Sequence, residues 1–200
     1  MRAALRILLT TGMALGAALA ATPASAHPSR DVSAGGHAGF DATADDPSTL
    51  AVDFDRVDGI ATMSVEWYDR TCVAGVGTEL PTCDHVSRTA ERVTPSAFRY
   101  SARGAMVRGN VTYQEIRYRC IGLGDDQVCS GQETGTGTGY VAARWSVNGE
   151  SSTEQYEGTD GRRYESTRFP TSARAVAFGR TYGNERVNIA QIGTTRLATP

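Results

Sequence analysis

The chain has 200 residues, 40% hydrophobic and 21% charged, which allows one ordinary domain and excludes a disordered chain, a collagen and a polytopic membrane protein. The formal net charge is −2, so the overall charge does not indicate nucleic acid as a partner. All 20 basic residues are arginine, which excludes chemistry that needs a lysine, such as Schiff-base formation, and indicates a GC-rich bacterial source.

Residues 1–26 have the pattern of a secretory signal peptide. Arg2 and Arg6 provide a basic start, an apolar run covers residues 7–21, and Ala24-Ser25-Ala26 is a small-residue cleavage site. The apolar run is too short and too rich in small residues for a good membrane span. We therefore expect a secreted, extracellular protein that begins at His27 and has no stable membrane anchor.

The next segment, residues 27–48, is rich in Ala, Gly, Ser and Asp and has one aromatic residue, Phe40. Such a segment buries too little apolar surface to order itself, so we expect a flexible leader. Residues 49–200 are then predicted to form a single all-β domain, which is long enough to bury one core.

Residues 50–67 predict a β-hairpin. Asp58-Gly59 favours a type I′ turn, because both residues tolerate positive φ, and folding the chain there pairs Val57 with Ile60. The register then places one apolar face against the core and the acidic residues on the opposite face. The residues of the predicted buried face are Leu50, Val52, Phe54, Met63, Val65 and Trp67.

Further strands follow with a period of two and without any helical pattern. Alternation covers residues 98–102, 106–120, 140–147, 173–178 and 187–192. Asn148-Gly149 and Asp160-Gly161 predict two successive hairpins, and a phase slip between Tyr113 and Ile116 predicts a bulge or sheet corner. The Gly/Thr-rich residues 131–139 are expected to be a flexible connector. The fold class is therefore all-β, an antiparallel β-sandwich or barrel-like meander.

The exported part has four cysteines, which predict disulfides in a secreted protein. Four cysteines allow three connectivities, and we favour Cys72–Cys83 and Cys120–Cys129, which give two disulfide-closed loops. Their intervals do not fit the close pairs of a zinc site. Each bridge is expected to contribute about 2–3 kcal/mol in the chain-entropy model.

Catalytic candidates are few. His85 follows Asp84, but the chain has no Gly-x-Ser-x-Gly elbow, so we expect a surface histidine there. Asp53 and Glu66 are predicted to be diagonal neighbours on the polar face of the hairpin, within the range of about 5–9.5 Å that separates glycosidase carboxyl groups. A solvated acidic face has the same pattern. A carboxylate-dependent hydrolase is therefore an alternative, and no catalytic residue is assigned.

The new N-terminus suggests a second enzymatic alternative. Cleavage after Ala26 would give His27 a free α-amine, and the amine and imidazole together can chelate copper with a second histidine, His37 or His85. In this respect the chain resembles the secreted copper-dependent polysaccharide monooxygenases, which also begin with a histidine. The resemblance implies a small copper oxidase. Apart from it, no metal or cofactor is predicted.

Charge is distributed unevenly along the chain. Residues 41–70 hold eight acidic residues and two arginines, whereas residues 86–120 hold seven arginines and two glutamates. Arg99 and Arg103 are predicted to share one outward strand face, and Arg117 and Arg119 another. If the two strands are neighbours, these four form a candidate anion-binding patch; a solvated face is the other interpretation.

The sequence favours a secreted, non-catalytic binding or interaction protein, because no catalytic set is assembled and β-rich folds carry recognition in loops. Its partner is unknown, and an anionic cell-surface polymer or a protein is expected rather than nucleic acid. A small secreted enzyme, either the hydrolase or the copper oxidase, is the alternative. An inhibitor or toxin would use residues 73–82 as its contact loop.

Overall fold

The computed structural model describes residues 33–77, 79–122 and 127–198. The predicted signal peptide, its cleavage site and His27 lie outside these residues. No helix in the described part of the chain has the length and hydropathy needed to cross a membrane.

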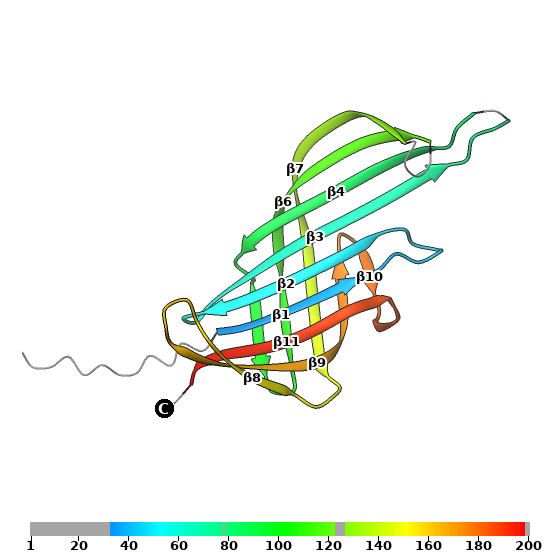
Figure 1. The fold of residues 1–200 in the computed structure, drawn as a ribbon. Helices are drawn as coiled ribbons and strands as arrows, with labels where there is room; N and C mark the ends of the chain where they lie inside the picture. The colour runs from blue at the N-terminus through cyan, green and yellow to red at the C-terminus, as the bar shows by residue number, and fades with distance from the viewer. Residues whose placement is uncertain (1–32, 78, 123–126, 199–200) are drawn as a thin grey trace, which may run out of the picture.

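Within the described residues the fold is almost entirely antiparallel β-structure, with one short 3-10 helix, η2 (Figure 1). In chain order the elements are β1 (Ser33–Phe40), β2 (Thr49–Val57), β3 (Ile60–Val73), β4 (Thr82–Val93), β5 (Ala97–Ser101), β6 (Gly104–Ile121), β7 (Val128–Val147), β8 (Ser152–Glu157), β9 (Arg163–Ala177), β10 (Arg180–Tyr182), η2 (Asn184–Arg186) and β11 (Val187–Leu197).

The strand pairings form a closed circuit: β1–β2–β3–β4–β6–β7–β9–β11 and back to β1. The first part of β6 pairs with β5 and its last part with β4, while β9 pairs first with β8 and β11 and then with β7. Because β6 and β9 change partners along their length, the strands are arranged in two layers. Figure 1 shows β1–β4 and β11 side by side in one layer, with β6 and β7 passing behind them.

The predicted hairpin of β2 and β3 is confirmed in its register. Val57 pairs with Ile60, Phe54 with Met63 and Leu50 with Trp67. Asp58 and Gly59 both have positive φ, at 50° and 82°, as the predicted turn requires. All six residues of the predicted apolar face are buried.

The core lies between the two layers. It consists of alternate side chains of the strands, with small residues of β9 beside larger ones of β7: Trp145 pairs with Ala173, and Val141 with Ala177. The largest fully buried side chains are Trp145, Tyr182, Phe40, Phe54, Met63 and Ile192. Alternation of this kind buries one face of each strand and leaves the other to solvent.

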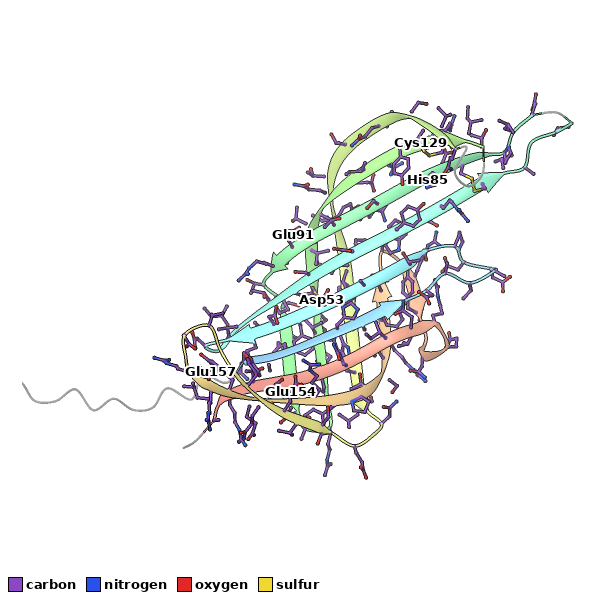
Figure 2. All side chains as sticks on the ribbon, viewed as in Figure 1. Asp53, His85, Glu91, Cys129, Glu154 and Glu157 are labelled. Carbon is purple, nitrogen blue, oxygen red and sulfur yellow. A yellow bond between two sulfur atoms is a disulfide. The ribbon has the colours of Figure 1, made fainter. Side chains whose placement is uncertain are left out.

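The two predicted disulfides are present, Cys72–Cys83 and Cys120–Cys129. Each joins residues that are direct register partners, on β3 and β4 and on β6 and β7 respectively. Cys83 and Cys120 are also register partners, so the four cysteines form one row across four strands. The bridges lie at the end of β3, β4, β6 and β7 where Figure 2 labels Cys129.

The expectation of a flexible leader is wrong for residues 33–40, because they form β1, which lies between β2 and β11. The strand is ordered by backbone hydrogen bonds on both edges rather than by large apolar side chains. Its small residues are needed for packing: a Cβ at Gly36 would lie 2.2 Å from a ring atom of Phe54. Low apolar content here reflects close packing, not disorder.

Two further expectations need correction. Asn148-Gly149 does not turn a hairpin, because β7 pairs with β9 instead of β8. All six residues of β8 are exposed, so β8 has no apolar face to place opposite Trp145. Residues 131–139 are part of β7 rather than a connector, and their glycines leave room for the rings of Tyr113 and Phe178. The Asp160-Gly161 hairpin occurs as predicted. The register of β6 with β7 is unbroken between Tyr113 and Ile116, where a bulge or corner was expected, and shifts instead between Arg117 and Arg119.

Candidate anion-binding site

A cavity of about 920 Å³ lies where the β2–β3 hairpin approaches β5, β6 and β7. Its volume is in the range of pockets that bind small molecules. The described residues that line it are Arg56, Gly59, Ala61, Phe98, Arg99, Tyr100, Ser101, Arg103, Gly104, Ala105, Met106, Arg144, Trp145 and Ser146. Four of these residues are arginines, and none is acidic.

The four pocket arginines come from four different parts of the fold. Arg56 is near the end of β2, Arg99 is in β5, Arg103 is in the β5–β6 turn and Arg144 is in β7. Arg99 and Arg144 point outward because their strand neighbours, such as Trp145, point into the core. The turn that carries Arg103 ends at Gly104 (φ 154°), where a Cβ would lie 2.2 Å from the Trp145 carbonyl oxygen.

None of the four pocket arginines forms an ion pair with a described residue, although ion pairs are common elsewhere in the fold. The described arginines with an acidic partner within ion-pair distance are Arg88, Arg117, Arg119, Arg162, Arg168, Arg180, Arg186 and Arg196. The pocket therefore concentrates uncompensated positive charge in a chain whose net charge is −2.

The aromatic side chains beside the pocket are packed into the core. The ring of Phe54 makes edge contacts with Phe98 at 5.4 Å and with Trp145 at 5.0 Å between centroids. The Trp145 indole also donates a hydrogen bond of 2.9 Å to the His37 carbonyl oxygen. Because these side chains are held from several directions, the aromatic part of the pocket lining is preformed.

The structure does not gather the four arginines of the predicted patch. Arg99 and Arg103 line the pocket, but Arg117 and Arg119 lie near the other end of β6. From Arg108, in the first part of β6, to Arg117 the strand extends about 30 Å at the usual rise per residue. Arg117 pairs with Glu115, and Arg119 pairs with Asp84. The strands are neighbours as expected, but β5 pairs only with the first part of β6.

Asp53 and Glu66 lie on the outer face of β2 and β3 as diagonal neighbours, as the hairpin register predicts. Figure 2 labels Asp53 on β2. Asp53 is hydrogen-bonded to His37 of β1, with 2.7 Å between Oδ1 and Nδ1. This hydrogen bond raises the pKa of His37, the negative charges of Asp53 and Glu66 add to the effect, and partial burial opposes it. The pair thus has a histidine partner that sequence reasoning had assigned to the leader.

Replacing Asp53 with asparagine is expected to lower the pKa of His37, which an NMR titration of the imidazole would measure. The raised pKa means that protonated His37 stabilises the fold below about pH 6.5, and this contribution is lost as pH rises through the folded-state pKa. The stability difference between wild type and the variant should therefore shrink above that pKa. An unchanged His37 titration in the variant would contradict the pairing.

His85 is buried rather than exposed, which corrects the expectation of a surface histidine. Its ring is stacked on Tyr118 at 4.6 Å between centroids, and its Nδ1 is hydrogen-bonded to the Tyr68 hydroxyl. Burial lowers the pKa of His85. The adjacent Asp84 bonds to Arg119 instead, so it does not orient the imidazole as a catalytic triad would.

The described residues contain no group of three or more His, Cys, Asp or Glu side chains placed to hold a metal ion. His27, the predicted copper ligand, lies outside them. His37 and His85, its two predicted partners, are on β1 and β4 and are each hydrogen-bonded to another side chain.

The fold and the pocket define an all-β, disulfide-bonded protein with a basic cavity at the junction of its two layers. Comparisons of the chain with models of protein families, with curated proteins and with solved structures find no match. A functional conclusion therefore has to be argued from the geometry and charge of the site.

Sequence reasoning missed Arg56 and Arg144 as members of the site. Arg56 lies two residues before the Asp58-Gly59 turn, and Arg144 lies between core residues of a correctly predicted strand. The alternation of β7 does predict that Arg144 points outward. Nothing local predicts that the end of β2 approaches β5 and β7.

Proposed function

We propose that this protein is a secreted, non-catalytic binding protein whose ligand is an anion held in the arginine-lined pocket. The observation that supports this most directly is the set of four arginines, Arg56, Arg99, Arg103 and Arg144, without an acidic partner among the described residues. The two disulfides and the signal-like N-terminus are compatible with export.

Arginine suits this role because its planar guanidinium carries five donors that match the oxygens of phosphate or carboxylate in pairs. A ligand that reaches several guanidiniums gains charge-assisted hydrogen bonds worth about 1.5–3 kcal/mol each. The described lining residues include no His, Asp or Glu, so the pocket offers no general base, which favours binding over catalysis.

The proposal is tested by titration calorimetry with pyrophosphate, a small anion with several charges. We expect binding that weakens as salt rises, because the contacts are electrostatic and partly exposed. Arg56→Gln/Arg103→Gln should weaken binding by about tenfold or more, which corresponds to about 1.4 kcal/mol or more. The pair is chosen because both residues line the pocket but neither packs in the core.

The matched control is Arg117→Gln/Arg119→Gln, which removes the same charge from a remote part of β6. It should leave pyrophosphate affinity within about twofold of wild type, because both side chains already have acidic partners and lie beyond the Debye length of about 8 Å. An equal loss in both double variants would show a diffuse charge effect and no site. Absence of pyrophosphate binding by the wild type would refute the proposal.

A further inference from the structure

The pocket continues into a second set of arginines on the outer face of the layer formed by β5, β6, β7 and β9. One register row across these strands reads Arg99, Met106, Arg144 and Arg174. Because all four are direct partners, their side chains lie on one face of the sheet. Trp145 and its neighbours occupy the opposite, buried face, so this row points to solvent.

Arg144 and Arg174 are directly opposite each other on β7 and β9. Like charges in this position destabilise a sheet, and neither arginine has an acidic partner among the described residues. The Arg144–Arg174 pair therefore makes no favourable contribution to the stability of the free fold. An anion placed between the two guanidiniums removes the repulsion.

Arg108 adds a fourth cation to the same face. It is two residues from Met106 on β6 and pairs with Ala97 and Ala142, so it points outward like the row. It also has no ion pair with a described residue. We call Arg99, Arg108, Arg144 and Arg174 the arginine face.

The remaining outward positions of these four strands contain no acidic residue within the part of the sheet that surrounds the arginine face. They are Ala97, Ser101, Gly104, Met106, Asn110, Tyr140, Ala142, Ser146, Ser172 and Val176. The four arginines therefore have no acidic neighbour at these positions of the four strands, and most of the other side chains there are small. A chain can lie flat against such a surface.

The dimensions exceed those of one compact anion. Neighbouring strands are about 4.8 Å apart, so the row from β5 to β9 spans about 14 Å. Arg99 and Arg144 belong both to this row and to the pocket, which makes the pocket and the arginine face one continuous surface. A ligand with a single charged group can use only one part of it.

From this continuity we infer that the ligand is a linear polyanion with repeated phosphodiester groups, which enters the pocket at one end and crosses the arginine face. The inference rests on the proposed function of the pocket and adds the class of ligand. Repeated phosphates match the separate guanidiniums. Tyr140 is the one aromatic residue among these outward positions, so the face has no stacking platform for nucleobases, and a polyol-phosphate polymer is the better fit.

The test compares a short glycerol-phosphate oligomer with one several times longer, both by titration calorimetry at several salt concentrations. We expect the longer oligomer to bind more tightly. Arg108→Gln/Arg174→Gln should weaken the longer oligomer by about tenfold and reduce the slope of log affinity against log salt by about two, one for each lost phosphate contact. The short oligomer should bind this variant as it binds wild type.

The complementary variant, Arg56→Gln/Arg103→Gln, alters only the pocket and should weaken both oligomers. If both oligomers bind equally and the Arg108→Gln/Arg174→Gln variant changes neither, the polymer inference is overturned while the proposed function stands. If neither oligomer nor pyrophosphate binds, both the polymer inference and the proposed function are refuted. Tighter binding of oligodeoxythymidylate of the same charge would overturn the choice of a polymer without bases.

The free protein offers an independent measurement. Arg174→Gln should raise the melting temperature slightly, because it removes the repulsion across the Arg144–Arg174 pair. The longer oligomer should raise the melting temperature of wild type more than that of this variant. A variant that melts lower than wild type would show that Arg174 stabilises the free fold, which contradicts a role reserved for a ligand.

Discussion

Replacing Trp67 with alanine is expected to lower the free energy of unfolding by about 3–5 kcal/mol, the range for large-to-small changes in a core. Trp67 is 5% exposed and lies on the apolar face of β3. Its indole nitrogen donates a hydrogen bond of 2.7 Å to the Tyr182 hydroxyl, which is itself buried. The guanidinium of Arg88 lies 4.6 Å from the ring centre. The substitution thus leaves a cavity and removes a partner from two polar groups.

Urea titration of this variant and of Glu66→Ala measures the effect against a matched neighbour. Glu66 is exposed on the opposite face of the same strand, so its replacement should cost less than about 0.5 kcal/mol. Trp67→Phe keeps most of the apolar volume and should cost less than Trp67→Ala, which keeps the comparison informative if the alanine variant does not fold. Reversed costs at positions 66 and 67 would mean that the strand faces the other way.

Replacing Asp46 with asparagine is expected to cost about 3 kcal/mol, because it removes the counter-charge of a buried arginine. The side chain of Arg186 is 5% exposed and donates a hydrogen bond of 2.8 Å to Asp46 Oδ2. The same guanidinium donates to the carbonyl oxygens of Asp41 and Ser48 and lies 4.5 Å from the ring centre of Tyr182. Without Asp46 this charge stays buried with neutral partners only.

Asp46 also predicts a pH dependence. Burial by itself raises the pKa of this carboxyl, but hydrogen bonds from Ser48 and Arg186 and the charge of Arg180 outweigh it and hold the pKa well below its usual range. A lowered pKa contributes stability above the unfolded value of about 3.9, and this stability is lost as pH falls through the folded-state pKa. Wild type should therefore lose its advantage over Asp46→Asn below about pH 4.

The control for this prediction is Asp84→Asn, which breaks the ion pair with Arg119. Both side chains of that pair are more than half exposed and screened by solvent, so the loss should be much smaller than that of Asp46→Asn. Measurement of both variants by urea titration at neutral pH distinguishes the buried from the exposed pair. Equal losses would show that the interactions of Arg186 do not depend on the charge of Asp46.

The β2–β3 hairpin and the disulfides show what local sequence can predict about this fold. Asp58-Gly59 selects the turn, and the alternation from Leu50 to Trp67 selects the face, so two independent local signals determine one register. Cys72 and Cys83 are likewise adjacent across a hairpin, where short separation favours pairing. These features need no information from distant parts of the chain.

The placement of β1 shows the opposite case. Its sequence, with three glycines and one large apolar residue, Phe40, predicts disorder. It is ordered because β2 and the far C-terminal β11 supply hydrogen-bonding partners on both edges, and because the Phe54 ring occupies the space that a Cβ of Gly36 would take. That partnership joins residues at the two ends of the described chain, so no local pattern contains it.

The same distinction between local and long-range information applies to the candidate site. Turn chemistry and alternation act between near neighbours, so local sequence is enough to predict the all-β class, the hairpin register, the disulfide pairing and the outward direction of Arg99. In contrast, long-range packing brings Arg56 and Arg144 together with Arg99 and Arg103, and it gives the arginines at the other end of β6 their acidic partners. Closure of the sheet brings distant strands together, and the charge around each guanidinium depends on that closure.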